Sequence, residues 1–311
     1  MGIIKSDFTI LITTKNRFED LVVTLKSIEG LLRNQQVECR IFDDGSEDGT
    51  FEFVSKNYPT ILLQRNEISR GYLYCRNVLL NQTTTKYAIS LDDDAHFVTE
   101  NPLESIQYYF DQNPNCGVVA ARIFWGLELP NNNVSNESTM SVQSFVGCAH
   151  VWRMKAWHDI PNYPEWFVFY GEEDFASYQL FKQNWSVHYL PKVLVQHRVD
   201  VKSRKKNSDY TIRLRRSLRS GWYLLFLFTP LQFTPRKLAY SVYIQLKSKV
   251  FKGDFKALQA LVGALIDLIV HVPKLIKFRK GLTLEEWKTY HELEKSKIYW
   301  QPQNDKKNEK L

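Results

Sequence analysis

Short hydrophobic runs alternate with longer amphipathic stretches over the amino-terminal third of the chain. The short runs are rich in β-branched and aromatic residues, which predicts strands, and the longer stretches carry apolar residues at helical spacing, which predicts helices. This alternation predicts an α/β fold with a mostly parallel, Rossmann-like central sheet and helices on both of its faces. The predicted strands are residues 8–14, 37–42, 61–64 and 87–91, and the predicted helices are residues 18–32, 50–56 and 72–81.

The hydrophobic pattern changes along the rest of the chain. Residues 145–152 and 193–196 are predicted to be strands, with a helix at residues 171–183 between them. Near residues 200–207 the strand signal fades, and amphipathic helical patterns continue to about Leu293. We therefore expect an α/β domain over residues 1–205, an amphipathic helical region over residues 206–300 and a disordered tail over residues 301–311.

Polar and acidic side chains lie at the carboxyl ends of three predicted strands. Thr13 lies at the end of the first strand, Asp44 follows the second, and Asp92 and Asp94 follow the fourth. Because the carboxyl ends of parallel strands lie at one edge of a sheet, these groups are expected to converge there. Several carboxylates at one edge repel each other unless a cation is bound, and Mg²⁺ and Mn²⁺ prefer oxygen ligands. The pattern therefore predicts a site for a divalent metal and a phosphate.

The acidic groups at the strand ends also have structural alternatives. Asp92 and Asp94 lie two residues apart, so both side chains can share one face and serve a metal. An acidic turn after a buried strand would have the same sequence. Asp44 could accept a hydrogen bond from the imide N–H of a uracil or thymine base, but its Asp-Gly sequence is equally typical of a turn that caps a helix.

A second group of candidate residues lies further along the chain. Residues 171–174, with the sequence Gly-Glu-Glu-Asp, open a predicted helix, where the helix dipole alone would account for acidic side chains. They follow the aromatic run 166–170, and a carboxylate of Glu173 or Asp174 that this run desolvates would be suited to act as a general base. His197 follows the strand at 193–196, where it is either a structural hydrogen-bonding residue or a metal ligand.

Charge and cysteine content bear on partners and compartment. Lys and Arg number 41 against 34 Asp and Glu, and the excess lies in residues 202–206, 213–219 and 274–280. Clustered positive charge suits a polyanion such as nucleotide phosphates, anionic lipid or nucleic acid. The four cysteines form no Cys-x-x-Cys pair, which favours free thiols in a reducing cytoplasm. Residues 1–7 lack the apolar core of a signal peptide, so we expect a cytoplasmic location.

Basic and apolar residues adjoin twice in the predicted helical region. The basic residues 213–219 precede the aromatic and aliphatic run 222–228, and the apolar stretch 258–272 precedes the lysines of 274–280. This arrangement suits helices lying on the anionic inner face of a membrane. The alternative is a helical subdomain that packs on the rest of the chain or forms a homodimer. Two polar residues interrupt 258–272, so we expect this stretch to be too short and too polar to span a bilayer, and any attachment to be peripheral.

Taken together, these motifs resemble those of family-2 glycosyltransferases, which have the glycosyltransferase-A fold. The family has an acidic Gly-Glu-Asp segment, and this chain has Glu173 where Asp is usual. The order and spacing of the motifs agree over roughly residues 7–200. The matching segments are Ile12 to Arg17, Asp-Asp-Gly-Ser-x-Asp-Gly-Thr at residues 43–50, Arg76-Asn77, Leu-Asp-Asp-Asp at residues 91–94, Gly147 with residues 171–174, and His197.

The resemblance implies a role for each candidate residue. Thr13, Asp44 and Arg76 would line the nucleotide, and Asp92 would contact the ribose or the metal. Asp94 and His197 would bind the metal, Mn²⁺ or Mg²⁺. The catalytic base would be Glu173, with the neighbouring Asp174 as the alternative because the family usually has Asp at this point of the motif.

The implied activity is sugar transfer with inversion at the anomeric carbon. The donor would be a UDP- or dTDP-linked sugar, and the acceptor a hydroxyl of a glycan, a lipid-linked molecule or another compound. Residues 1–205 would form the catalytic domain, and no nucleic-acid partner is expected. The alternative is a nucleotide-binding protein or a nucleotidyltransferase-like enzyme that transfers no sugar. Such an enzyme is expected to have a glycine-rich phosphate loop near its first strand, and residues 10–17 contain no glycine.

Overall fold

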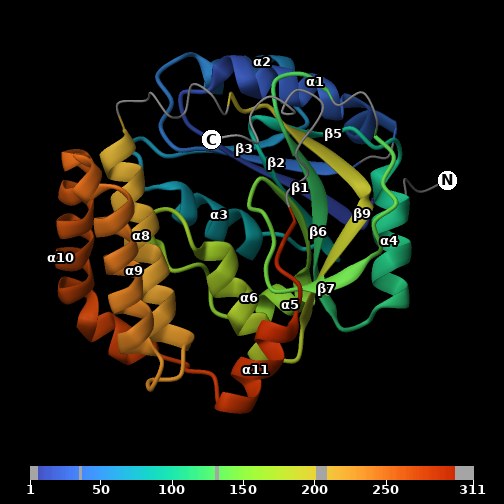
Figure 1. The fold of residues 1–311 in the computed structure, drawn as a ribbon. Helices are drawn as coiled ribbons and strands as arrows, with labels where there is room; N and C mark the ends of the chain where they lie inside the picture. The colour runs from blue at the N-terminus through green and yellow to red at the C-terminus, as the bar shows by residue number, and fades with distance from the viewer. Residues whose placement is uncertain (1–5, 35–36, 130–132, 201–208, 298–311) are drawn as a thin grey trace.

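A computed structural model describes residues 6–34, 37–129, 133–200 and 209–297 of the 311-residue chain. In these ranges a nine-stranded sheet is flanked by helices, and the carboxyl-terminal helices stand together at one side of it (Figure 1). The α/β fold predicted from the sequence is therefore confirmed. The predicted tail at 301–311 lies outside the described residues, as does the predicted boundary between residues 205 and 206.

The amino-terminal half of the sheet is parallel, as the alternation of strands and helices predicts. Its strand order is β3-β2-β1-β4, and every neighbouring pair runs parallel. Each predicted element of this half is present, with bounds that differ from the prediction by at most two residues. The elements are β1 (Phe8–Thr14), α1 (Phe18–Asn34), β2 (Glu38–Asp43), α2 (Thr50–Asn57), β3 (Leu62–Arg65), α3 (Tyr72–Asn81) and β4 (Tyr87–Asp92).

The second half of the sheet is mixed. From β4 the order continues β8-β6-β9-β5, with only β6 and β9 parallel, and β7 pairs with β9. The predicted strand at 145–152 is shorter and later, because β8 begins only at Ala149. The elements are β5 (Ala95–Phe97), α4 (Pro102–Gln112), β6 (Cys116–Trp125), β7 (Met140–Val142), β8 (Ala149–Arg153), α5 (Met154–His158), η1 (Glu165–Phe167), α6 (Glu172–Lys182) and β9 (Ser186–His197).

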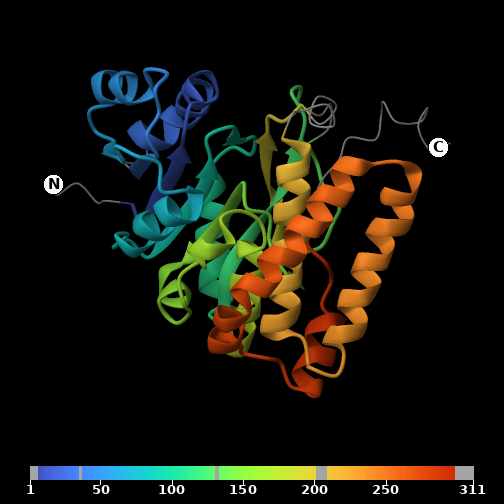
Figure 2. The same ribbon diagram turned by 90° about the vertical axis from the view of Figure 1, so that its left-hand side faces the viewer.

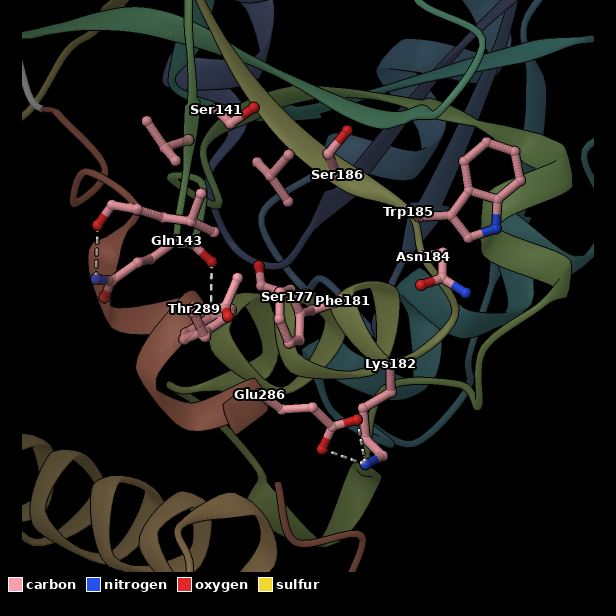
Figure 3. Close-up of a pocket in the computed structure, with 14 residues that line it drawn as sticks. Ser141, Gln143, Ser177, Phe181, Lys182, Asn184, Trp185, Ser186, Glu286 and Thr289 are labelled. Carbon is pink, nitrogen blue, oxygen red and sulfur yellow. Dashed lines mark hydrogen bonds and ion pairs between the residues drawn. The ribbon is translucent and has the colours of Figure 1, made fainter. Parts of the chain in front are cut away.

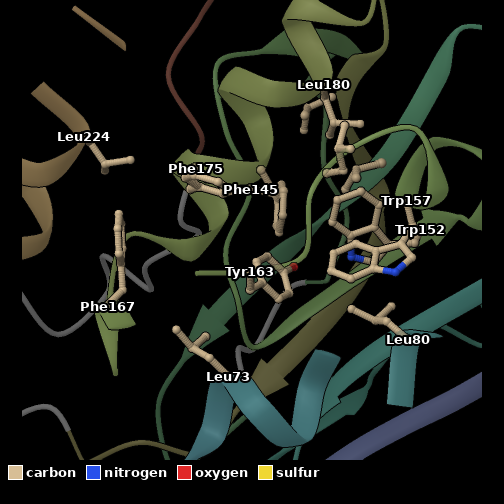
Figure 4. Packing of buried hydrophobic residues seen from close by; sticks show 14 of the residues in the cluster. Leu73, Leu80, Phe145, Trp152, Trp157, Tyr163, Phe167, Phe175, Leu180 and Leu224 are labelled. Atoms are coloured by element: carbon tan, nitrogen blue, oxygen red, sulfur yellow. The ribbon is translucent and has the colours of Figure 1, made fainter. Parts of the chain in front are cut away.

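Side chains alternate between two hydrophobic clusters, one on each face of the sheet. In β1, for example, Ile10 and Ile12 belong to one cluster and Leu11 belongs to the other, as the two-residue period of a strand requires. The second cluster is aromatic, and Trp152 and Phe175 lie within it (Figure 4). Burial on both faces stabilises the sheet and fixes the strand ends that carry the acidic residues.

The carboxyl-terminal helices share this aromatic cluster. Trp222, Tyr223 and Phe228 are buried in the same cluster as Trp152. Of the two alternatives for the run 222–228, a lipid-facing surface is wrong, because most of these side chains pack inside the protein. The helices are α8 (Tyr210–Phe228), α9 (Thr234–Ser248), η2 (Val250–Lys252), α10 (Phe255–Phe278) and α11 (Leu284–Glu292).

The helix α10 is longer than the sequence pattern indicated. It has 24 residues, whereas the apolar stretch recognised in the sequence was 258–272. By length and composition it is apolar enough to cross a membrane, as no other helix in the described ranges is. The expectation that this segment is too short to span is therefore wrong. The helix extends past both ends of the apolar stretch because Lys256 and Lys274 do not interrupt helical backbone.

Candidate functional site

The register of the parallel strands brings the predicted polar groups to one edge of the sheet. Thr13 pairs with Asp92, and Thr14 pairs with Asp43, so three strands end side by side. His197 reaches the same edge from the other half of the sheet, because β9 ends there and His197 pairs with Ala95 of β5. The convergence expected from the sequence is therefore present in the fold.

Asp92, Asp94 and His197 form a compact group of possible metal ligands. One ligand atom from each residue lies within 4.8 Å of the others. The Nε2 atom of His197 lies 2.9 Å from Oδ1 of Asp94, and both of these side chains are buried. Two carboxylates and one imidazole, in a place that phosphate oxygens and water can complete, are a donor set that fits Mn²⁺ or Mg²⁺.

Arg17, which the sequence analysis did not single out, stabilises these carboxylates. Its guanidinium lies 2.6 Å from Oδ2 of Asp94 and 3.0 Å from Oδ1 of Asp93. Burial alone would raise the pKa of Asp94, but the hydrogen bond and charge of His197, together with Arg17, lower it. Asp94 is therefore held as a carboxylate, whereas Asp93 pairs with Arg17 and does not join the ligand group. In the sequence, Arg17 was visible as the last residue of the motif segment from Ile12 to Arg17, but that motif gave it no role.

Arg76 contacts Asp92, and nearly all of its side chain is buried. Its guanidinium donates to Oδ1 of Asp92 and to the hydroxyl of Ser90, and it lies 3.2 Å from the carbonyl oxygen of Gly147. The hydroxyl of Tyr72 lies 3.4 Å from the same Asp92 oxygen. The structure thus shows Arg76 orienting Asp92; its predicted contact with a nucleotide stays a prediction.

Asp44 has all of its acceptor positions filled by the loop between β3 and α3. Its Oδ1 accepts from the Asn66 side chain at 2.7 Å and the Arg70 amide at 2.8 Å, and its Oδ2 accepts from Ser69 at 2.6 Å and the Gly71 amide at 2.9 Å. Burial would raise the pKa of Asp44, but these hydrogen bonds outweigh it and lower the pKa. A carboxylate accepts about four hydrogen bonds, so a contact with a base would displace one of these donors.

Thr13, unlike Asp44, has a polar atom without a hydrogen-bond partner among the described residues. That atom is its hydroxyl oxygen, which is buried. Buried hydroxyls are normally satisfied, so an unpaired one at a strand end is a place where a ligand atom is expected to bind. The predicted contact of Thr13 with a nucleotide stays a prediction.

Glu173 lies directly against the backbone of Gly147. Helix α6 begins after Gly171, whose φ of 84° is readily adopted only by glycine, and this turn aims Glu173 at the segment before β8. A Cβ atom on Gly147 would collide with Oε1 of Glu173, so a larger residue at position 147 would displace the Glu173 carboxylate from its place. The sequence motif paired these residues, and the structure gives the steric reason.

The three consecutive acids of α6 differ in their surroundings. Glu172 is buried, Glu173 is half-buried and the Asp174 residue is exposed. Burial raises the pKa of Glu172, and burial followed by the negative charge of Glu172 raises the pKa of Glu173 well above its usual value. Arg76 opposes both shifts. A raised pKa is the property a general base needs near neutral pH, but burial also raises the pKa of Asp174, so this shift does not separate the two residues. The contact with Gly147 is what favours Glu173.

A strained turn precedes these acids and is held by α8. Val168 has φ 66° and ψ −49°, and the Phe169 amide donates to the Phe167 carbonyl at 2.8 Å, which is a γ-turn. Arg219 of α8 donates to the same Phe167 carbonyl, and Ser220 donates to the Phe169 carbonyl at 3.2 Å. A β-branched residue in this conformation persists only where its surroundings hold it. The sequence analysis placed Arg219 in the basic run 213–219 and gave no signal of this buried contact.

A separate pocket of about 410 Å³ lies between β9, α6 and α11 (Figure 3). Lys182 and Glu286, which carry the charges of its lining, pair with each other at 3.1 Å. None of the predicted site residues lines this pocket. The acidic strand edge and this pocket are therefore two different places.

Comparison with known proteins agrees with this architecture. Mannosyltransferase PcManGT from Pyrobaculum calidifontis, in complex with GDP-Man and Mn²⁺, superposes with a TM-score of 0.55 at 15% identity, over 93% of this chain and 79% of that one. S. aureus TarS 1-349 superposes with a TM-score of 0.52 at 17% identity, over 87% of this chain and 82% of that one. GalNAc-T7 with UDP, GalNAc and Mn²⁺ superposes with a TM-score of 0.51 at 14% identity over 62% of this chain, which spans only 43% of the GalNAc-T7 chain. A search of curated protein sequences finds no significant match.

These likenesses define the class of the fold. It is the glycosyltransferase-A fold, a mostly parallel sheet that carries acidic residues at the ends of its strands. The sequence profile of glycosyl transferase family 2 matches residues 9–172, more than half of the chain. The chain therefore belongs to glycosyl transferase family 2, and the resemblance inferred from the motifs is confirmed.

Proposed function

We propose that this chain is an inverting, metal-dependent glycosyltransferase with Glu173 as its catalytic base. In this proposal it moves a sugar from a UDP- or dTDP-linked donor to a hydroxyl of a glycan or lipid-linked acceptor. Transfer from a nucleotide sugar is the activity of the family, whereas the base, the metal, the donor and the acceptor are inferences about this chain.

The contacts of one glycine carry the proposal. Gly147 leaves the space that the Glu173 carboxylate occupies, and its carbonyl oxygen lies 3.2 Å from the Arg76 guanidinium that also binds Asp92. A candidate base and a candidate ligand of the metal or ribose are thereby linked through the contacts of a single residue. Single displacement needs the base and the metal site to be fixed relative to each other, because the acceptor hydroxyl and the departing diphosphate must both be aligned with the reacting carbon.

Asp92, Asp94 and His197 would hold Mn²⁺ or Mg²⁺. A divalent cation bound there would neutralise the charge that develops on the departing nucleotide diphosphate. The protein's own part is to keep Asp94 ionised through His197 and Arg17 and to orient Asp92 through Arg76. The structures of PcManGT and GalNAc-T7, which contain Mn²⁺, support this assignment by analogy of fold.

Glu173 would remove the proton of the acceptor hydroxyl as that oxygen attacks the sugar. Its raised pKa increases its strength as a base, and Arg76 limits the shift so that the carboxylate form remains accessible. The γ-turn at Val168 and the left-handed Gly171 would fix the direction of the side chain. The unpaired hydroxyl of Thr13 would receive a polar atom of the nucleotide.

A panel of donors tests the proposal. The protein is incubated with Mn²⁺ and UDP-, dTDP- or GDP-linked sugars, and phosphorus NMR follows release of the nucleoside diphosphate. We expect release from a UDP or dTDP sugar, with inverted anomeric configuration in the product. Release from a GDP sugar alone would contradict the pyrimidine assignment, retained configuration would contradict single displacement, and no release from any donor would contradict the activity itself.

A further inference from the structure

One face of α10 is apolar and is left uncovered by the other described parts of the chain. The α10 stripe consists of Phe255, Val262, Ile266, Ile269, Val270 and Ile276, whose side chains are between 47% and 79% exposed. Their spacing places them along a single side of the helix. Figure 2 views the molecule from the side on which α10 lies and shows this helix crossing the outside of the protein. A continuous apolar surface of this kind marks a site of interaction.

The opposite face of α10 is firmly attached to the protein. Ala260, Ala264 and Leu268 are buried on that side. The carboxylate of Asp267 accepts two hydrogen bonds from Arg215 of α8, at 2.6 and 2.7 Å. The helix thus has one face anchored on α8 and one face available to a partner.

The exposed charges around the stripe are mostly positive. Residues 251–280 contain six basic and two acidic residues. Both acids are engaged, since Asp254 accepts from the Ala257 amide and the Tyr210 hydroxyl, each at 2.8 Å, and Asp267 pairs with Arg215. The exposed lysines lie near both ends of the helix, Lys252 and Lys256 on either side of Phe255, and Lys274, Lys277 and Lys280 around Ile276.

We propose that the α10 stripe docks this protein onto an anionic lipid surface, with α10 lying in the plane of that surface. An apolar side flanked by exposed lysines matches the boundary between acyl chains and anionic headgroups. The proposal goes beyond sugar transfer and does not depend on the identity of the donor or the acceptor.

Two observations separate this docking from other uses of the stripe. With 24 residues α10 is about 36 Å long and could cross a bilayer, but crossing would remove it from α8 and place Asp267 in hydrocarbon without Arg215. A second copy of the chain would meet lysines at both ends of the helix in either orientation, so two stripes repel each other electrostatically. Anionic lipid is the partner that the charges favour.

Vesicle sedimentation of the full chain tests the proposal, without donor or metal so that failure of the proposed function cannot affect the result. The vesicles contain equal parts of phosphatidylglycerol and phosphatidylcholine, or phosphatidylcholine alone. We expect binding to the anionic vesicles that weakens but persists at high salt, because the charge contribution is screened and the apolar contribution is not. Ile269→Glu should weaken this binding at least tenfold. The matched control is Tyr108→Glu, at an exposed residue of α4 on the other side of the molecule, which should bind like the wild type (Figure 1).

Circular dichroism shows whether each variant is folded. If Ile269→Glu fails to fold, the double variant Lys274→Glu, Lys277→Glu tests the contribution of the charges. This charge variant should lose binding mainly at low salt. No binding of the folded wild type to anionic vesicles at low salt would overturn the proposal. Equal loss in Ile269→Glu and Tyr108→Glu would also overturn it. Dimer formation through the stripe would overturn the proposal as well. It would appear in analytical ultracentrifugation as a mass that doubles with protein concentration and returns to that of the monomer in Ile269→Glu, with no binding of the wild type to vesicles.

Discussion

At the scale of single residues, the position of Gly147 links the two halves of the site. The glycine was visible in the sequence as part of a motif, but its reason was not, because Glu173 lies 26 residues away along the chain. The structure shows that the Glu173 carboxylate fills the space where a Cβ would be. Arg17 was missed for the same reason, since its partners Asp93 and Asp94 are distant in sequence. Residue types at strand ends are predictable from the sequence, whereas the partners that tune their charge are not.

The assignment of the base predicts a difference between two neighbouring substitutions. Glu173→Gln removes the half-buried carboxylate against Gly147 and should lower turnover by about 10²–10⁴-fold while leaving donor affinity near that of the wild type. Asp174→Asn changes an exposed neighbour and should have a much smaller effect. Steady-state turnover and donor titration measure both quantities. Near-normal turnover of Glu173→Gln would remove Glu173 from the mechanism.

The raised pKa of Glu173 predicts the pH dependence of turnover. The base acts as a carboxylate, so activity should rise with pH through the pKa of Glu173, and the midpoint should lie above the ordinary value for a glutamate because burial and Glu172 raise that pKa. Asp174 adds to this shift and Arg76 opposes it. Glu172→Gln should move the midpoint to lower pH. A pH profile of turnover at saturating donor measures it, and a midpoint unchanged by Glu172→Gln would contradict the coupling.

At the scale of elements, α8 connects the helical region to the acidic motif. Arg219 and Ser220 bind the carbonyls of the strained turn at 167–169, and Gly171 packs against Ser220. Helix α8 itself was expected from the amphipathic pattern. Its packing beside the acids was not, because a hydrophobic pattern shows which face is apolar but not what covers it.

The long strands β6 and β9 were missed or shortened for local reasons: β6 is buried throughout and shows no alternation, and β9 contains Pro191, near which its pairing with β6 shifts register.

The contact between α8 and the turn predicts that Arg219 acts as a positioning residue. Arg219→Met keeps the aliphatic volume but removes the charged hydrogen bond to Phe167, worth about 1.5–3 kcal/mol, so the melting temperature should fall. Turnover should fall roughly 10- to 100-fold because the carboxylate of Glu173 is less well placed, whereas donor affinity should stay within a few-fold. Arg213→Met, the same change on the same helix, is the control. Equal turnover losses in the two variants would contradict the positioning role.

At the scale of the whole molecule, the sheet and the carboxyl-terminal helices share one aromatic cluster. Trp222 and Phe228 of α8 lie in the same cluster as Trp152 of the sheet. The division into residues 1–205 and 206–300 stays a prediction about the chain, but these contacts indicate that the two parts stabilise each other. The class of fold followed from the sequence because strand–helix alternation is a local pattern. The shared cluster did not follow, because it depends on contacts between distant segments.

The metal requirement of nucleotide release tests the central claim most directly. The measurement is the rate of nucleoside diphosphate release from the best donor, in excess chelator and after Mn²⁺ or Mg²⁺ is restored, for the wild type and for Asp94→Asn. The cluster of Asp92, Asp94 and His197 predicts no release in chelator and recovery with either cation. It also predicts little recovery for Asp94→Asn at the same cation concentration. Full release by the wild type in excess chelator would contradict the account.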